Sequence, residues 1–143
     1  MKVNLVVAAR EVRVDESTND LDILGVITEA LPHALPGLLP LMNLILWCEA
    51  EATEFGQERL IEIFLVDADG KVRQRWYDTY AVPRARRTGE RSFSTPIFSL
   101  RNVPFRKPGN YAFNVHVDGD HKNSLPFYVH KPTETDEPEE GEA

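Results

Sequence analysis

The side chains best suited to chemistry are the basic residues of one stretch, residues 71–91. Seven bases fall there against two acids, a local net charge of +5 in a chain whose net charge is −7. The bases are Lys71, Arg73, Arg75, Arg84, Arg86, Arg87 and Arg91. Guanidinium groups bind carboxylates and phosphates through paired hydrogen bonds. The stretch therefore predicts a contact surface for an acidic protein partner.

Two other interpretations of the basic stretch stay open. Nucleic acid could bind it, although a net charge of −7 opposes non-specific binding to a polyanion. The bases could equally form an ordinary solvated face, or a resting place for the acidic residues that end the chain. If Lys71, Arg73 and Arg75 alternate outward, their strand and the loop after Pro83 share one basic patch with Tyr77.

A second candidate contact surface is the segment Leu31–Met42, which is unusually apolar for a connection between strands. It contains three prolines and no charged residue. Most connections run over the surface, so its leucines either pack across one open end of the fold or form an interface, including one between copies of the chain. Leu35, Leu38 and Leu39 are the residues we expect to make contact.

Residues typical of metal or nucleophilic sites are scattered. The histidines are His33, His116, His121 and His130, and none lies at tight metal-ligand spacing from another. Cys48 lies among Leu44, Leu46 and Trp47, and a cysteine in such surroundings behaves as a small hydrophobic side chain. No Gly-rich phosphate loop, nucleophile elbow or HExxH motif is present. We therefore expect no catalytic residue, no bound metal and no cofactor, and a binding or adaptor module in place of an enzyme.

A small-ligand binder or enzyme with a site between loops remains the alternative. The fold class sets no limit on such a grafted site. A pocket that collects His33, Asp22 or Glu29 beside a basic side chain would favour it, and a surface without pockets would count against it.

Two Asp-Gly pairs predict tight hairpins. They are Asp69-Gly70 and Asp118-Gly119, each between runs of alternating apolar residues. Glycine readily adopts the positive φ that such turns need. The clustered carboxylates could also suggest calcium, but the distant glutamate of an EF-hand loop is missing, so turn formation is the stronger interpretation.

Apolar side chains alternate with a period of two along most of the chain, and helical periodicity is nearly absent. We expect strands over residues 2–14, 21–29, 43–50, 59–66, 71–82, 91–100, 111–117 and 125–129, with Pro96 marking an edge or bulge and a loop at 102–108. The run at 43–50 is apolar on both faces, which predicts a central strand covered on both sides. The fold class is all-β, a two-sheet β-sandwich of immunoglobulin-like architecture with seven to nine mostly antiparallel strands.

The length of 143 residues fits one domain over residues 1–130, followed by a disordered acidic tail over 131–143 with six acids and one base. The single cysteine excludes an intramolecular disulfide and favours a reducing, cytoplasmic location. The apolar run at 3–9 is too short to span a membrane and the segment 30–48 is broken by prolines, so no membrane contact is expected.

Several of these turn and core motifs occur together in a known kind of protein. They are Asp22–Val26 after a polar turn, the proline-rich connection, Val66–Gly70, and Pro108–Phe113 leading to Val117–Gly119. With them the chain resembles, over about residues 1–130, a family of small uncharacterised bacterial β-sandwich proteins. The resemblance implies the fold and a bacterial origin, and it carries over no activity or site.

Overall fold

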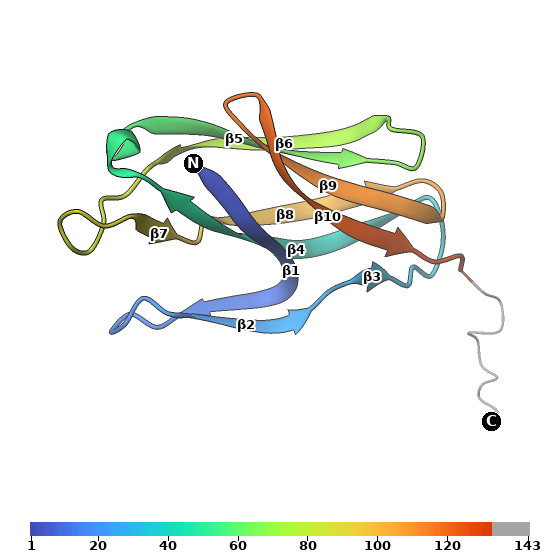
Figure 1. Ribbon diagram of the computed structural model, residues 1–143. Coiled ribbons are helices and arrows are strands. Elements are labelled where there is room, and N and C mark those ends of the chain that lie inside the picture. The colour runs from blue at the N-terminus through green and yellow to red at the C-terminus, as the bar shows by residue number, and fades with distance from the viewer. Residues whose placement is uncertain (133–143) are drawn as a thin grey trace.

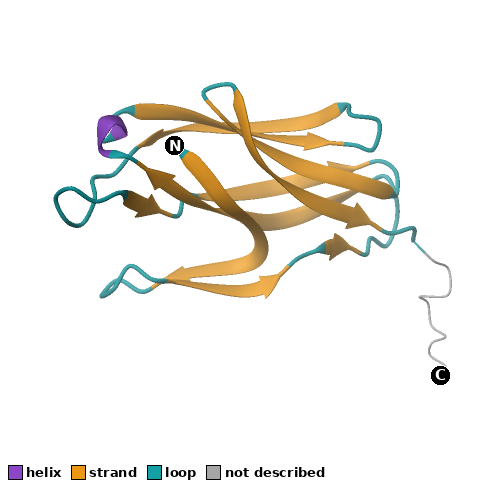
Figure 2. Cartoon of the chain, viewed as in Figure 1, coloured by secondary structure: helices purple, strands orange, loops and turns teal. Residues whose placement is uncertain are grey.

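The computed structural model describes residues 1–132, which form two packed β-sheets (Figure 1). Ten strands make up most of this region, and the only helix in it is one 3₁₀ turn, η1 (Ala52–Glu54) (Figure 2). All strand pairs are antiparallel except one short parallel pair between β3 and β10.

The first sheet is organised around its longest strand, β4 (Gly37–Ala50). On one side β4 pairs with β1 (Lys2–Val14), which pairs in turn with β2 (Leu21–Val26). On its other side β4 pairs first with β8 (Ile97–Phe105) and then with β7 (Ser92–Ser94). The chain between β7 and β8 contains Pro96, whose carbonyl accepts a hydrogen bond from the Leu46 amide at 3.0 Å, so the expected interruption at this proline is confirmed.

The second sheet has the strand order β3-β10-β9-β5-β6. Its strands are β3 (Glu29–Ala30), β5 (Glu58–Val66), β6 (Val72–Ala81), β9 (Gly109–Val117) and β10 (Asp120–Val129). Both Asp-Gly pairs form the predicted hairpins, with Gly70 at φ 82° and Gly119 at φ 89°. Turn formation also accounts for Asp67 in the first hairpin, because its side chain accepts hydrogen bonds from the Asp69 and Lys71 amides at 3.0 and 2.9 Å.

The prediction of an all-β fold with two packed sheets is confirmed, and the strand count is ten where seven to nine were expected. Two of the expected strands are each divided in the structure. The segment 21–29 becomes β2 and β3, which belong to different sheets, and the segment 91–100 becomes β7 and β8.

Two predicted loops are shorter than expected, because strands extend into them. The strand predicted at residue 43 begins at Gly37, and β8 continues to Phe105, which leaves residues 106–108 of the loop predicted at 102–108. The two prolines that suggested loops, Pro40 and Pro104, lie in this β4–β8 ladder. Pro40 falls opposite Asn102, whose φ of 54° departs from extended geometry, and regular pairing resumes on both sides of them. A proline is tolerated where the ladder is already irregular.

The core lies between the sheets, where alternate side chains of each strand are removed from water. Phe113 at its centre is fully buried and contacts Phe127 edge to face, with ring centroids 5.6 Å apart. On β4, Leu44, Leu46 and Cys48 face this core and are fully buried. The opposite face of β4 is only partly covered, since Ile45 is buried whereas Trp47 is 50% exposed. The expectation of a strand covered on both sides therefore holds for only part of β4.

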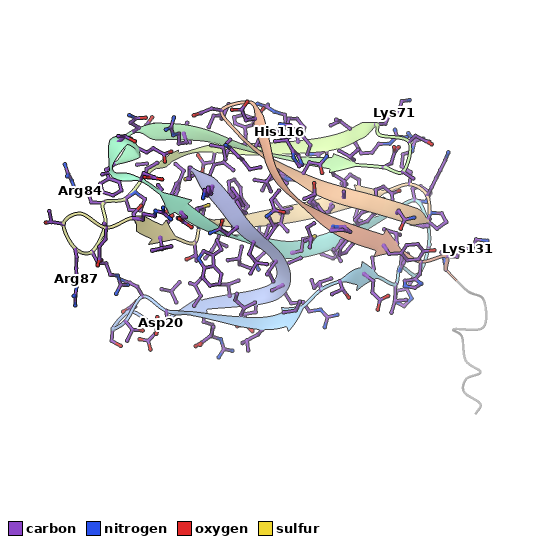
Figure 3. All side chains as sticks on the ribbon, in the orientation of Figure 1. Asp20, Lys71, Arg84, Arg87, His116 and Lys131 are labelled. Atoms are coloured by element: carbon purple, nitrogen blue, oxygen red, sulfur yellow. The ribbon has the colours of Figure 1, made fainter. Side chains whose placement is uncertain are left out.

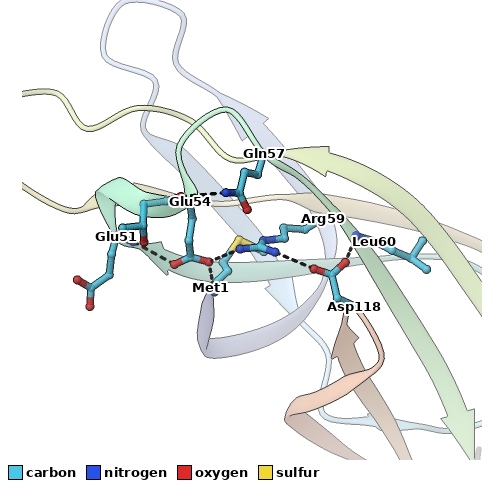
Figure 4. A network of polar contacts seen from close by, with 8 residues as sticks. Met1, Glu51, Glu54, Gln57, Arg59, Leu60 and Asp118 are labelled. Carbon is cyan, nitrogen blue, oxygen red and sulfur yellow. Dashed lines mark hydrogen bonds and ion pairs between the residues drawn. The ribbon is translucent and has the colours of Figure 1, made fainter.

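A polar network ties the second sheet to the turn at η1 (Figure 4). Asp118 accepts hydrogen bonds from the Leu60 amide at 2.8 Å and from the Arg59 guanidinium at 3.0 Å. Arg59 also donates to Glu54 at 3.1 Å, and Glu54 pairs with the Met1 amine. The Leu60 amide bond first, and the Arg59 guanidinium with it, hold the pKa of Asp118 below its usual range.

No helix among residues 1–132 is long and apolar enough to cross a membrane. The acidic tail predicted for 131–143 lies, from residue 133 onward, outside the described residues.

The Cys48 thiol gives a direct test of the packed core. Burial raises its pKa to about 12, which confirms the expectation of a buried cysteine and leaves almost no reactive thiolate near neutral pH. We expect the folded protein to resist a thiol-specific colorimetric reagent, and one thiol per chain to react promptly in denaturing urea. Rapid stoichiometric reaction in native buffer would contradict the burial of β4.

Asp118→Asn tests the polar network. Because the pKa of Asp118 is lowered by folding, its charge stabilises the folded state above the unfolded pKa, and this contribution is lost as pH falls through the folded pKa. Asparagine keeps an acceptor for the Leu60 amide and tolerates the φ of 50° at this position. We expect a loss of about 0.5–1 kcal/mol in urea unfolding near neutral pH, since the carboxylate is partly exposed.

The difference between Asp118→Asn and the parent protein should shrink as pH falls below the ordinary pKa of aspartate, about 3.9, and vanish below the lowered folded pKa, where Asp118 is protonated in both states. The control is Asp120→Asn, which removes an exposed carboxylate two residues away that has no hydrogen-bond partner among residues 1–132. A pH-independent loss in Asp118→Asn would assign its effect to turn geometry instead of charge.

Candidate functional site

The basic residues of the stretch 71–91 do not form one patch, so that prediction is wrong. Lys71 precedes β6 and Arg84 follows it, and the ten residues of β6 place them at opposite ends of the molecule (Figure 3). A strand of that length spans roughly 30 Å. The basic side chains on the strand and those on the loop therefore belong to separate surfaces.

Three of the predicted contact arginines are held by carboxylates of their own sheet or loop. Arg73 pairs with Asp67 at 2.9 Å, and Arg75 pairs with Glu62 at 2.7 Å. The Arg75 guanidinium also lies 4.3 Å from the centre of the Tyr77 ring, so these two residues do share a face, as expected. These contacts account for the charge of Arg73 and Arg75 within the chain.

The third held arginine, Arg91, lies at the end of the loop. Its Nη1 is 2.6 Å from a Glu49 oxygen on β4, and its Nη2 is 3.9 Å from Glu51. Hydrogen bonds from Asn4 first, and from Arg91 as well, hold the pKa of Glu49 below its usual range. Arg91 therefore anchors the loop to β4 and leaves Glu49 fully engaged.

The remaining three, Arg84, Arg86 and Arg87, form a group that we call the arginine loop. All three are exposed, and none has a carboxylate within ion-pair distance among residues 1–132. Together with Ala52 and Phe55 they line a hollow of about 520 Å³ at one end of the molecule.

Both ends of this loop are fixed to the body of the protein. On the β6 side, Val82 is buried and exchanges backbone hydrogen bonds with Gln57 and Gly56 at 3.0 and 2.9 Å. On the β7 side, Ser92 is buried opposite Ala50. The arginine loop is therefore a short span between two anchored points.

Two acids of the elements beside the arginine loop are engaged elsewhere, and Glu90 of the loop itself forms no ion pair among residues 1–132. Glu54 bonds to the Met1 amine and to Arg59, and the amine first among these partners lowers its pKa. Glu49 bonds to Asn4 and Arg91. The positive charge of the arginine loop is therefore not neutralised by these neighbours.

The apolar segment Leu31–Met42 divides into two parts. Its second half is the start of β4, and its first half is a strap that connects β3 to β4. Leu35 and Leu39 are half-buried and pack against the core, which confirms packing for these two, whereas Leu38 is 62% exposed.

A pocket of about 680 Å³ lies between this strap and the first residues of β4, and Phe105 forms part of its wall. Leu35, Leu38 and Leu39 all line it. The pocket brings together Glu29 and His33 with one basic side chain, Arg10, which matches the arrangement named above as favouring a ligand site. Asp22 is absent from it, because it pairs with Arg13 in the β1–β2 ladder.

Arg10 was missed by the sequence reasoning. It lies on β1, more than twenty residues before the strap, in a run of mixed charge that shows only strand periodicity. No local pattern relates it to the proline-rich segment.

Metal binding was the other chemistry considered for the acidic and histidine side chains. Among residues 1–132, no group of three or more His, Cys, Asp or Glu side chains could hold a metal ion.

Comparison with known proteins identifies the family of this chain but no activity. No curated protein matches the chain. Residues 4–130 match a family of unknown function, DUF6941, and this match covers all but the ends of the two-sheet structure. The chain therefore belongs to the DUF6941 family of unknown function.

Proposed function

We propose that this protein is a non-enzymatic binding module, and that its arginine loop binds an acidic segment of a protein partner. The observation that carries this proposal is the difference between the basic residues: Arg73, Arg75 and Arg91 are paired within the chain, whereas Arg84, Arg86 and Arg87 are exposed and unpaired among residues 1–132. Three guanidinium groups within four positions suit two or three closely spaced carboxylates.

The shape of the site favours a short segment of a protein over nucleic acid. The cationic surface is one loop around a hollow, and it does not continue along the neighbouring strand, where Arg73 and Arg75 are neutralised. Binding to a nucleic acid gains most of its strength from many phosphates contacted along a groove. The net charge of −7 further opposes that kind of partner.

Further proposals accompany this function. We infer that the two sheets form an immunoglobulin-like β-sandwich, an architecture that commonly presents its binding residues on loops at one end. We also propose a bacterial source, which the resemblance to small bacterial β-sandwich proteins implies, and a cytoplasmic location, which the single buried cysteine favours. The exposed Leu38 and the pocket beside it form a second surface, separate from the arginine loop.

Replacing Arg84, Arg86 and Arg87 together by serine tests the proposal. The probe is a fluorescein-labelled peptide of alternating glutamate and glycine, followed by fluorescence anisotropy at physiological salt. Three exposed ion pairs of about 0.5–1 kcal/mol each predict a loss of affinity of roughly 10- to 100-fold in the triple variant. A single-stranded oligonucleotide of equal charge is the competing probe.

The matched control replaces Arg101, Arg106 and Lys122 by serine, which removes the same charge from exposed positions outside the arginine loop. If both triple variants lose the same affinity, binding depends on overall charge and the proposal fails. Tighter binding of the oligonucleotide than of the peptide would favour nucleic acid. A full-length variant with amides in place of the six acids of residues 133–143 shows whether that tail competes for the loop.

A further inference from the structure

A second site lies where β1 separates from β4. The two strands pair from Lys2 to Ala9 on β1, and the last pair is Ala9 with Asn43. Beyond this point β1 pairs only with β2, and the first six residues of β4 have a strand partner on one side alone. The fork between the strands opens into the pocket of about 680 Å³ described above.

The Asn43 side chain satisfies the backbone hydrogen bonding at the point where β1 and β4 separate. Its side-chain amide donates to the Arg10 carbonyl at 3.1 Å, and its side-chain oxygen accepts from the Ser99 hydroxyl at 2.7 Å. The Arg10 carbonyl is the first one beyond the β1–β4 ladder, so a side chain supplies the partner that the strand no longer provides. The pocket is therefore a defined feature of the fold, with its backbone groups satisfied at the apex.

The strap that covers the pocket is fixed at several points. Ala30 accepts a hydrogen bond from the His130 amide at 3.0 Å, and Glu29 lies 2.6 Å from the His130 ring. At the other end of the strap, a Cβ at Gly37 would lie 2.6 Å from the Ala34 carbonyl oxygen, so the turn there requires glycine. Phe105 beneath the strap is buried and contacts the Tyr111 and Phe127 rings, at 5.0 and 5.8 Å. Because the strap and the wall beneath it are held by these contacts, the cavity is preformed.

The lining of the pocket is apolar apart from three side chains, Arg10, Glu29 and His33. Glu29 is engaged with His130, whereas Arg10 has no ion-pair partner among residues 1–132. The stem of Arg10 lies against Gly25, where an added Cβ would come within 3.4–3.5 Å of three of its carbons. The pocket therefore combines an apolar wall with one guanidinium, that of Arg10, which forms no ion pair among residues 1–132, while the Glu29 carboxylate of the lining is hydrogen-bonded to His130.

We propose that this pocket binds a small apolar molecule that carries one anionic head group, a carboxylate or a phosphate. The apolar body would lie along the strap and the start of β4, and the head group would pair with the Arg10 guanidinium. A volume near 680 Å³ is within the range of small-molecule sites, about 300–1,000 Å³. Such a ligand would also cover Leu31 and Leu38, which are 75% and 62% exposed.

The test uses displacement of a fluorescent fatty-acid analogue from the full-length protein. The competitors are dodecanoate and dodecyl phosphate, both below their micelle concentrations, and the neutral ester methyl dodecanoate, below its solubility limit. We expect both anions to displace the probe and the ester to bind roughly tenfold more weakly, because it cannot pair with Arg10. Dodecanoate and dodecyl phosphate together distinguish which anionic head group the site prefers.

Two variants separate the roles of charge and apolar surface. Arg10→Met keeps an apolar stem and should weaken the better anion roughly tenfold while leaving the ester nearly unchanged. Leu38→Gln removes apolar surface from an exposed position of the lining without adding charge, and it should weaken anions and ester alike. Their controls are Arg106→Met and Leu24→Gln, both at exposed positions outside the lining, which should bind like the parent protein.

Amide shifts in a two-dimensional NMR spectrum locate the bound ligand independently of affinity. We expect the largest shifts at Leu31, Ala34 and Leu38 and none at the side chain of Trp47, which belongs to a different apolar hollow on the outer face of the first sheet. Shifts centred on Trp47, equal binding of ester and anions, an unchanged anion affinity in Arg10→Met, or no displacement by any competitor would each overturn the proposal.

Discussion

Burial of the inner face of β4 is the interaction on which the rest of the structure depends. Leu44, Leu46 and Cys48 are fully removed from water there, against the inner side chains of the second sheet such as Phe113. Burial of one large aliphatic side chain contributes about 1.5–3 kcal/mol, so the two leucines of this face contribute several kcal/mol. Because β1, β7 and β8 each pair with β4, their positions follow from its placement.

The length of β4 also creates the two surfaces that we associate with function. Its first residues extend beyond the reach of β1, so the sheet forks and leaves the apolar pocket beside the strap. Its last residues, Cys48–Ala50, pair with β7, and the loop that leads from β6 to β7 must cross between the two sheets there. The arginine loop and the pocket are therefore consequences of one long strand with different partners along its length.

Charge is distributed so that the two surfaces differ in chemistry. Near the arginine loop, Glu49 and Glu54 are each hydrogen-bonded to other groups, which lowers their pKa values, and neither pairs with an arginine of the loop. At the pocket, Glu29 is engaged with His130 and the positive charge of Arg10 remains. In both places a carboxylate close in space is already satisfied, and an arginine is left available for an external anion.

Local sequence patterns were sufficient to predict an all-β, two-sheet fold, the two Asp-Gly hairpins, the interruption at Pro96 and the burial of Cys48. These features depend on local turn geometry and on which side chains alternate, and both are encoded by neighbouring residues. The sequence also indicated that the arginines and the proline-rich leucines are unusual. The local pattern was misleading at Pro40 and Pro104. Pro40 lies opposite Asn102, where the pairing is irregular, and Pro104 lies on β8, which has a strand partner on one side only.

Only the tertiary structure decided which arginines are available and where the pocket lies. The pairing of Arg91 with Glu49 joins residues 42 positions apart, and Arg10 reaches the strap only because β1 leaves β4 after Ala9. Strand alternation fixes the face on which a side chain lies, but it leaves strand order and register open. Contacts between distant strands set the charge balance and the cavity, and these contacts arise from the packing of the whole domain.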